Sequence, residues 1–147
     1  MRNALRVSLT VLSLACGAAM GAGMSRQDYQ AAKKGIDAQY QAERQKCGGR
    51  YGNALDLCVA RAHGIRDVAK AELEAAYKPG PRADYNAAIA RAKAAYNLAR
   101  EECDESRGAD KKACIGEAKA ALARSRAEAK ARLAAERAEE TAKPRAR

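Results

Sequence analysis

The sequence predicts an all-α protein of two tandem antiparallel helical hairpins, each stapled by a disulfide, with a long C-terminal helix. Three observations carry this prediction. The 147-residue chain lacks Phe and Trp, is 31% charged, and is rich in alanine, lysine, arginine and glutamate, which favour helices. A shift of 56 residues (103 minus 47) aligns the chain with itself at tyrosine, cysteine and glycine positions. Four of the five cysteines form two pairs with identical spacing.

Residues 1–22 are predicted to form a secretory signal peptide. Arg2 and Arg6 precede a short apolar run, and small residues follow this run. Cleavage is expected after Ala19 or Ala22. This run is too short to cross a bilayer, and no later segment is sufficiently apolar. We therefore expect a periplasmic protein with no transmembrane segment in its mature chain.

Cys16 lies inside this predicted signal peptide and separates two interpretations. In the favoured one, Cys16 is removed with the signal peptide. In the alternative, Cys16 is acylated and the protein is an outer-membrane lipoprotein that acts as a spacer, although Ser13 stands where lipoproteins carry leucine. Removal of Cys16 leaves four cysteines in an oxidising space, and an even number there predicts disulfides.

The first hairpin repeat is expected over residues 26–78. Its first helix has an apolar stripe at helical spacing, interrupted only by a glutamate: Tyr29, Ala32, Ile36, Tyr40, Glu43 and Cys47. The stripe of its second helix comprises Leu55, Cys58, Ala62, Ile65, Ala69, Leu73 and Ala76. Such narrow stripes indicate helices that pack against one neighbour. Gly48 and Gly49 predict the end of the first helix, with Asn53 as the next N-cap and Asp56 in the first turn.

The second repeat is expected over residues 84–142, after a Pro/Gly linker at residues 79–83 that must interrupt the helix. Its first helix repeats the stripe as Tyr85, Ala88, Ala92, Tyr96, Ala99 and Cys103. Gly108 and Asp110 predict the turn. The last helix is expected to outrun its partner and to carry alternating charges at four-residue spacing, namely Arg124, Glu128, Arg132 and Glu136. Residues 143–147 are expected to form a disordered tail.

The four remaining cysteines are interpreted as structural staples. Each pair spans a short loop between helix ends, and closing such a loop stabilises by about 3 kcal/mol on the chain-entropy model. Three pairings exist; Cys47 with Cys58 and Cys103 with Cys114 is favoured because duplication kept the spacing within each copy. Reversible, redox-responsive bonds are the alternative to permanent staples.

No catalytic, cofactor or metal site is predicted, and we expect a non-enzymatic protein without cofactors. His63, the only histidine, lies beside the apolar stripe and is expected to face solvent. The cysteine spacing does not fit a zinc site with four thiolate ligands, because it lacks the close ligand pairs that such sites use. The acidic run at residues 101–110 fails as a calcium loop, because Ala109 and Ile115 replace its required glycine and glutamate.

The charge pattern limits the classes of partner that we expect. The net charge is +10, and removing the two arginines of residues 1–22 leaves +8, with both signs interspersed along the chain. Without a basic stripe carrying base-reading groups, and with export predicted, we expect no nucleic-acid partner. The expected partners are envelope proteins, anionic envelope surfaces or a second copy of this chain.

Three segments carry a family resemblance: "DYQAAKKGIDAQYQAERQKC", "AKAELEAAYKPGPRADYNAAIARAKAAYNLAREEC" and "KKACIGEAKAALARSRAEAKARL". They resemble small exported alanine-rich proteins of beta-proteobacteria that are often labelled TolA-like cell envelope biogenesis proteins. The resemblance spans nearly all of residues 28–132 and implies an envelope-associated structural or interaction role. A stress-related periplasmic binding protein or chaperone, whose hairpins open to expose their stripes, is the alternative.

Overall fold

The computed structural model describes residues 23–143, so the predicted signal peptide, Cys16 and all but the first residue of the predicted tail lie outside it. The described chain forms four helices: α1 (Arg26–Gln45), α2 (Gly52–Tyr77), α3 (Pro81–Glu102) and α4 (Gly108–Ala142), with a 3-10 turn η1 (Cys103–Glu105) after α3. No strand occurs within this part, which confirms the all-α prediction. None of its helices combines the length and apolar character that a membrane span requires.

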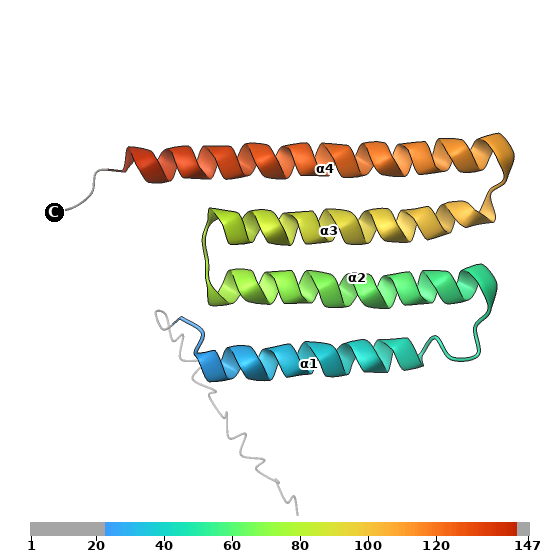
Figure 1. The fold of residues 1–147 in the computed structure, drawn as a ribbon, viewed down its shortest axis with the longest axis horizontal. Coiled ribbons are helices and arrows are strands. Elements are labelled where there is room, and N and C mark those ends of the chain that lie inside the picture. Colours follow the sequence, from blue (N-terminus) through green and yellow to red (C-terminus); the bar gives the residue numbers. More distant parts are fainter. Residues whose placement is uncertain (1–22, 144–147) are drawn as a thin grey trace, which may run out of the picture.

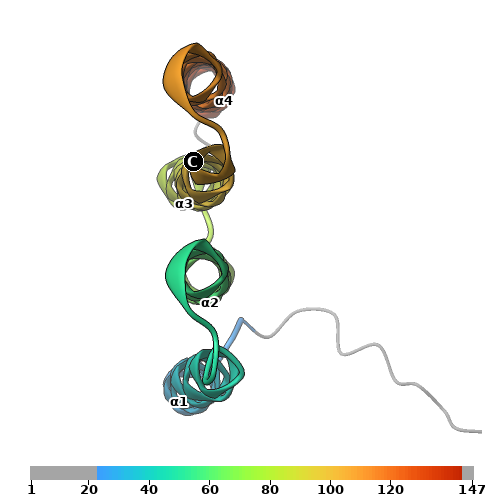
Figure 2. The same ribbon diagram turned by 90° about the vertical axis from the view of Figure 1, so that its right-hand side faces the viewer.

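The helices form an antiparallel meander, and each one lies beside its neighbour in sequence (Figure 1). Seen end-on, all four lie in a single layer rather than in a bundle (Figure 2). The main contacts join α1 to α2, α2 to α3 and α3 to α4. The most extensive of these is between α2 and α3, across the break between the two copies. The two predicted hairpins are therefore confirmed, and they pack side by side as one layer.

The core of this layer is thin. Among residues 23–143 the buried side chains are Tyr29, Cys47, Ala62, Ala87, Ala92, Cys103, Ala118, Ala129 and Leu133. Most of them are alanines, which remove little apolar area from water and stabilise correspondingly little. The fold must therefore depend on helix propensity and on its covalent links.

Helix α1 follows its predicted pattern. Ser25 caps its N-terminus by accepting a hydrogen bond from the Asp28 backbone N–H at 3.1 Å. Every member of the predicted stripe is buried or partly covered. Tyr29 stacks on Tyr77 with ring centroids 4.3 Å apart, and its hydroxyl donates a hydrogen bond to Glu74. The start of α1 is thereby held to the end of α2.

The start of α2 differs from the prediction. The helix begins at Gly52, which has a φ of 54°, and Tyr51 occupies the N-cap position. Because glycine takes this left-handed conformation without strain, the helix starts two residues earlier than a cap at Asn53 requires. Asn53 therefore lies inside the first turn, and Asp56 lies beyond that turn.

The stripe of α2 also differs at two predicted positions. Ile65 is 41% exposed, and Ala76 is exposed as well. Each residue advances about 100° around a helix, so Ile65 lies about 60° away from Ala62 and toward one face of the layer. Arg66, one residue further, is the side chain that reaches α1. In a helix this rich in alanine, steps of three and four residues do not fix the seam.

Helix α3 begins earlier than predicted. Its first residue is Pro81, and Gly80 is the N-cap, so the break is shorter than residues 79–83. Proline fits the first position of a helix because the missing N–H has no intrahelical partner there. The predicted stripe faces α4. A second stripe, missed in the sequence, faces α2: Ala83, Ala87, Ala90, Ala94 and Leu98. Its 4-3-4-4 spacing was the available signal.

Helix α4 has 35 residues against 22 in α3, so it outruns its neighbour (Figure 1). Between Leu133 and the end of the described chain, only Glu136 is partly covered. The predicted ladder of alternating charges forms none of the ion pairs found within residues 23–143. Steps of four residues advance 40° each, so the ladder winds about 120° around the helix between Arg124 and Glu136.

Two glycines inside helices have no close-contact reason to be there. A Cβ added at Gly35 in α1 or at Gly116 in α4 meets nothing within 4 Å. Gly35→Ala and Gly116→Ala are each expected to stabilise the oxidised protein by about 1 kcal/mol, because alanine restricts the unfolded chain and favours helix. Urea unfolding followed by circular dichroism measures this; a lower midpoint in either variant contradicts it.

Candidate functional site: the disulfide turns and the two faces of the layer

The structure pairs the four cysteines within their copies, Cys47 with Cys58 and Cys103 with Cys114. The Cα–Cα distances are 5.6 and 5.7 Å, inside the usual disulfide range. In both copies the first cysteine follows the first helix of the hairpin. The second cysteine is the seventh residue of the next helix, counted from Gly52 or Gly108. The two turns are thus built alike.

A left-handed glycine positions each staple. Gly52 has a φ of 54° and Gly108 a φ of 57°, and each is the first residue of its helix. A side chain in this conformation is strained, even though neither glycine has an atom within 4 Å of an added Cβ. The backbone at these two positions directs the second helix back toward the first, where the cysteines meet.

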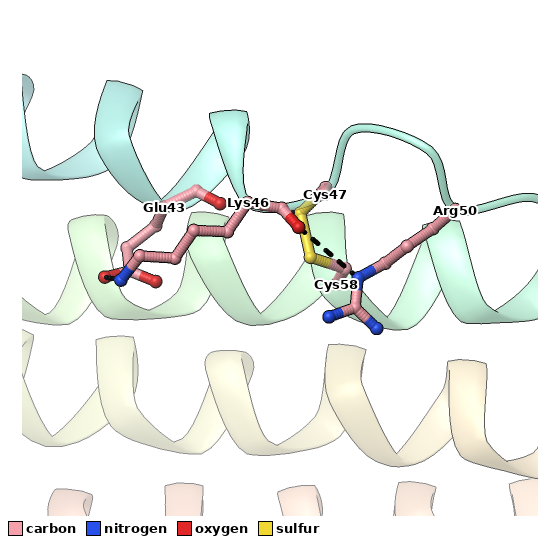
Figure 3. Close-up of a disulfide and its surroundings, with 5 residues drawn as sticks. All are labelled: Glu43, Lys46, Cys47, Arg50 and Cys58. Carbon is pink, nitrogen blue, oxygen red and sulfur yellow. Dashed lines mark hydrogen bonds and ion pairs between the residues drawn. A yellow bond between two sulfur atoms is a disulfide. The ribbon is translucent and has the colours of Figure 1, made fainter.

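The surroundings of the first staple are polar on one side (Figure 3). Lys46 pairs with Glu43 at 2.7 Å, and the Arg50 Nε–H donates a hydrogen bond to the Lys46 carbonyl at 3.5 Å. Cys47 is only 2% exposed, whereas its partner Cys58 is half-buried and lines an adjacent groove. One cysteine of the staple is therefore shielded, and the other borders a groove.

His63 does not simply face solvent, as the sequence suggested, but is half-buried between α1 and α2. Its Nε2 lies 3.1 Å from the Tyr40 hydroxyl, and the Arg66 guanidinium lies 4.4 Å from the centre of the Tyr40 ring. At about 100° from Ala62, His63 still borders α1, and a long tyrosine reaches it. This cluster fastens the middle of α1 to α2.

Groups of three or more His, Cys, Asp or Glu side chains arranged to hold a metal are absent from residues 23–143. The cysteines in this part are paired in disulfides, so they present no thiolate nucleophile.

An exposed ion pair also joins the first hairpin. The Lys70 Nζ lies 2.6 Å from Asp37 Oδ1, and this hydrogen bond is the main cause that lowers the pKa of Asp37 below its ordinary value. A lowered pKa in the folded state gives stability above the ordinary carboxyl pKa, which is lost as pH falls through the folded pKa.

Asp37→Asn is therefore expected to lower the urea midpoint slightly at neutral pH and to leave it unchanged in strong acid. The effect is small because both side chains of the pair are well exposed. Equal losses of the urea midpoint at neutral and strongly acid pH contradict the role assigned to this pair. Lys70 is present in both proteins, so the comparison reports on the Asp37 carboxylate alone.

One broad side of the layer, termed the apolar face, carries a groove of about 470 Å³ between α2 and α3. Its apolar lining includes Ile65, Val68, Ala95 and Leu98. Ala95 also lines a second groove on this face, between α3 and α4, and Glu128 is another of the residues that line it. Acidic and basic side chains are both present here, so this face carries mixed charge.

The opposite side, termed the basic face, shows a different charge pattern. Lys93 lies about 200° around α3 from Arg91 of the apolar face, and it lines a groove with His63 and Asp67 on this opposite side. On α4 one flank of the helix carries only basic charges at seven- and four-residue steps, here called the basic stripe: Lys112, Lys119, Arg126, Lys130 and Arg137.

The basic stripe corrects the expectation that charges are not gathered in one patch. Arg126 and Lys130 stand two residues before and after Glu128, about 200° around the helix, and so belong to the opposite face. All five side chains of the stripe are exposed, and none belongs to the ion pairs within residues 23–143. Signs that alternate along the sequence are thus sorted between faces by the helix.

Comparisons with protein-family models, curated proteins and solved structures gave no match to this chain.

Proposed function

We propose that this protein is a non-enzymatic interaction module of the bacterial envelope that works in the periplasm. The observation that carries the proposal is the single layer of four helices, which leaves two broad faces open where a bundle would bury one (Figure 2). A chain with so thin a core and so much exposed helical surface suits binding better than catalysis.

Export is supported by the cysteines and by the N-terminal pattern. Two short covalent loops stabilise a thin fold where disulfides persist, which is outside the cytoplasm. The charged, apolar and small-residue order of residues 1–22 fits a signal peptide. The resemblance to TolA-like envelope proteins favours the same compartment and an envelope-associated role.

Cell fractionation with thiol trapping tests the location. Cells that produce the chain are treated with a thiol-blocking reagent before lysis, and the protein is then analysed by intact mass and peptide mapping. We expect a periplasmic chain that lacks the signal peptide and has no blocked cysteine among the four of residues 23–143. A cytoplasmic full-length chain with blocked thiols contradicts the proposal, and an acylated Cys16 replaces it with the lipoprotein form.

Site-specific photo-crosslinking in living cells tests the interaction role. A photoreactive residue is placed at Ile65 on the apolar face, at Lys119 on the basic face, or at Gln41 on the outer edge of α1 as the matched control. Reproducible envelope adducts from a face position, absent at Gln41, support the proposal. Absence of adducts from both faces contradicts it.

A chaperone role is the second candidate, and one observation favours it. The exposed Ile65 lies with Val68 and Leu98 in an apolar groove that no other segment of residues 23–143 covers. If this groove holds unfolded clients, the oxidised protein should slow the aggregation of a reduced or heated model protein. Ile65→Gln should abolish that protection, whereas Gln41→Ala should not; equal protection by both variants contradicts the role.

A further inference from the structure

The basic stripe follows one line along a straight helix. From Lys112 to Arg137 it rises through 25 residue steps, or about 38 Å. Because the four helices lie in one plane, the stripe borders a flat surface rather than a cleft (Figures 1 and 2). Lys93 of α3 lies on the same side of the layer. A row of unpaired cations on a flat face attracts an extended anionic partner.

The duplication supplies an internal comparison. The 56-residue shift places four stripe positions, Lys112, Lys119, Arg126 and Lys130, onto Asp56, His63, Lys70 and Glu74 of α2. With neutral histidine, the first-copy set carries a net charge of −1 where the second carries +4. The two copies share helices, turns and staples, so the fold does not require the cations.

One pair of equivalent positions differs in charge between the two copies. In the first copy Asp37 and Lys70 form an ion pair at 2.6 Å, and the shift places Lys93 and Arg126 at the same two positions. The second copy therefore carries two like charges at the positions where the first has an attractive contact, and like charges at neighbouring positions repel each other. Likewise Glu74, which accepts a hydrogen bond from Tyr29, is replaced by Lys130. An anion bound at this face removes the repulsion.

We propose that the basic face of the α3–α4 hairpin binds the surface of an anionic phospholipid bilayer. A plane matches a flat row of cations over its whole length, whereas a duplex of nucleic acid curves away from it. Helix α4, which bears the stripe, has no aromatic side chain on which bases could stack. Its lysines and arginines are the side chains that anionic headgroups attract. The inference names the partner class for one face and rests on the proposed envelope location.

Vesicle co-sedimentation with two charge-matched variants tests the proposal. The stripe variant carries Lys119→Gln, Arg126→Gln and Lys130→Gln. The control variant removes three exposed charges that lie off the stripe and form none of the ion pairs of residues 23–143, namely Arg61→Gln, Arg124→Gln and Arg132→Gln. Both have the same net charge and the same residues 1–22, so binding by that apolar segment is common to both. Urea-unfolding midpoints and thiol assays check that both remain folded and oxidised.

The purified full chain should bind vesicles made of equal parts phosphatidylglycerol and phosphatidylcholine, and should bind pure phosphatidylcholine vesicles far less. The stripe variant should lose about 100-fold in affinity, and the control variant much less, since each surface cation contributes about 1 kcal/mol. Raising the salt concentration should release the wild type. Equal losses in both variants, binding that ignores lipid charge, or tighter binding to short duplex DNA than to the vesicles overturns the proposal. Because purified protein is used, a negative result here is distinct from a failure of periplasmic location.

Discussion

Replacing all four staple cysteines by alanine is expected to leave the protein without a cooperatively folded structure at room temperature. The variant should then show no cooperative melting transition, rather than a transition at a lower temperature. Each bond closes a loop with a sequence separation of 11, worth about 3 kcal/mol on the chain-entropy model. Two such losses, about 6 kcal/mol, rival the whole stability of an ordinary domain. The alanine-rich core offers little in compensation. Thermal melts and hydrogen exchange measure the loss.

The single-pair variants show where each staple acts. Cys47→Ala with Cys58→Ala should loosen α1, whose substantial contacts are with α2, and leave α3 and α4 protected from exchange. Cys103→Ala with Cys114→Ala should loosen α4 instead. Helical circular dichroism alone is a poor readout, because free alanine-rich helices keep part of their signal. A four-alanine variant that melts within a few degrees of the wild type shows that packing, not the staples, holds the layer.

Gly64→Leu is expected to force α2 and α3 apart. A Cβ added at Gly64 lies 3.1 Å from the Ala94 Cβ and 3.7 Å from its Cα, so a larger side chain has no room unless the helices separate. Overpacking of this kind costs about 1–3 kcal/mol. Because this seam joins the two copies, the loss should appear in the cooperative transition of the whole layer.

Gly116→Leu is the matched control, since an added Cβ there meets nothing within 4 Å. It gives the same gain in helix propensity without the clash, so the difference between the two variants isolates the overpacking. That difference should be about 1–3 kcal/mol in urea unfolding. Adding Ala94→Gly to Gly64→Leu should restore part of the loss. Equal effects of the two leucines show that α2 and α3 do not meet at Gly64.

The features predictable from the sequence were those marked by rare residues. Tyrosines and cysteines fixed the stripe from Tyr29 to Cys47 and its counterpart in α3, because few other positions in the chain offer comparable side chains. The glycine-rich turns and the repeat then required two hairpins. These signals survive in an alanine-rich background, and the structure follows them closely.

The features that were missed depend on alanine or on geometry that sequence spacing does not display. The second seam of α3, around Ala87 and Ala94, was hidden because alanine occurs on every side of that helix. Ile65 was assigned to the α1 seam because it is large and apolar, yet it lies toward an open face. The basic stripe is not visible in the linear order of charges, because residues seven and four positions apart come together on one side only when the chain is helical.

The start of α2 was missed for a reason specific to glycine. A short polar side chain at Asn53 is a good N-cap in the sequence, but the positive φ of Gly52 begins the helix before it. The side-chain nitrogen and oxygen of Asn53 are buried without a hydrogen-bond partner in the structure. Pro81 was likewise counted as a breaker, whereas it opens α3.

The meander of Figure 1 has a kinetic consequence. Substantial contacts join only helices that follow each other in sequence, so the relative contact order is low and rapid folding is expected. A hairpin that collapses locally brings Cys47 to Cys58 before the second pair has to form, which disfavours scrambled isomers during oxidation. The order of the helices along the chain is thus also a natural order of assembly.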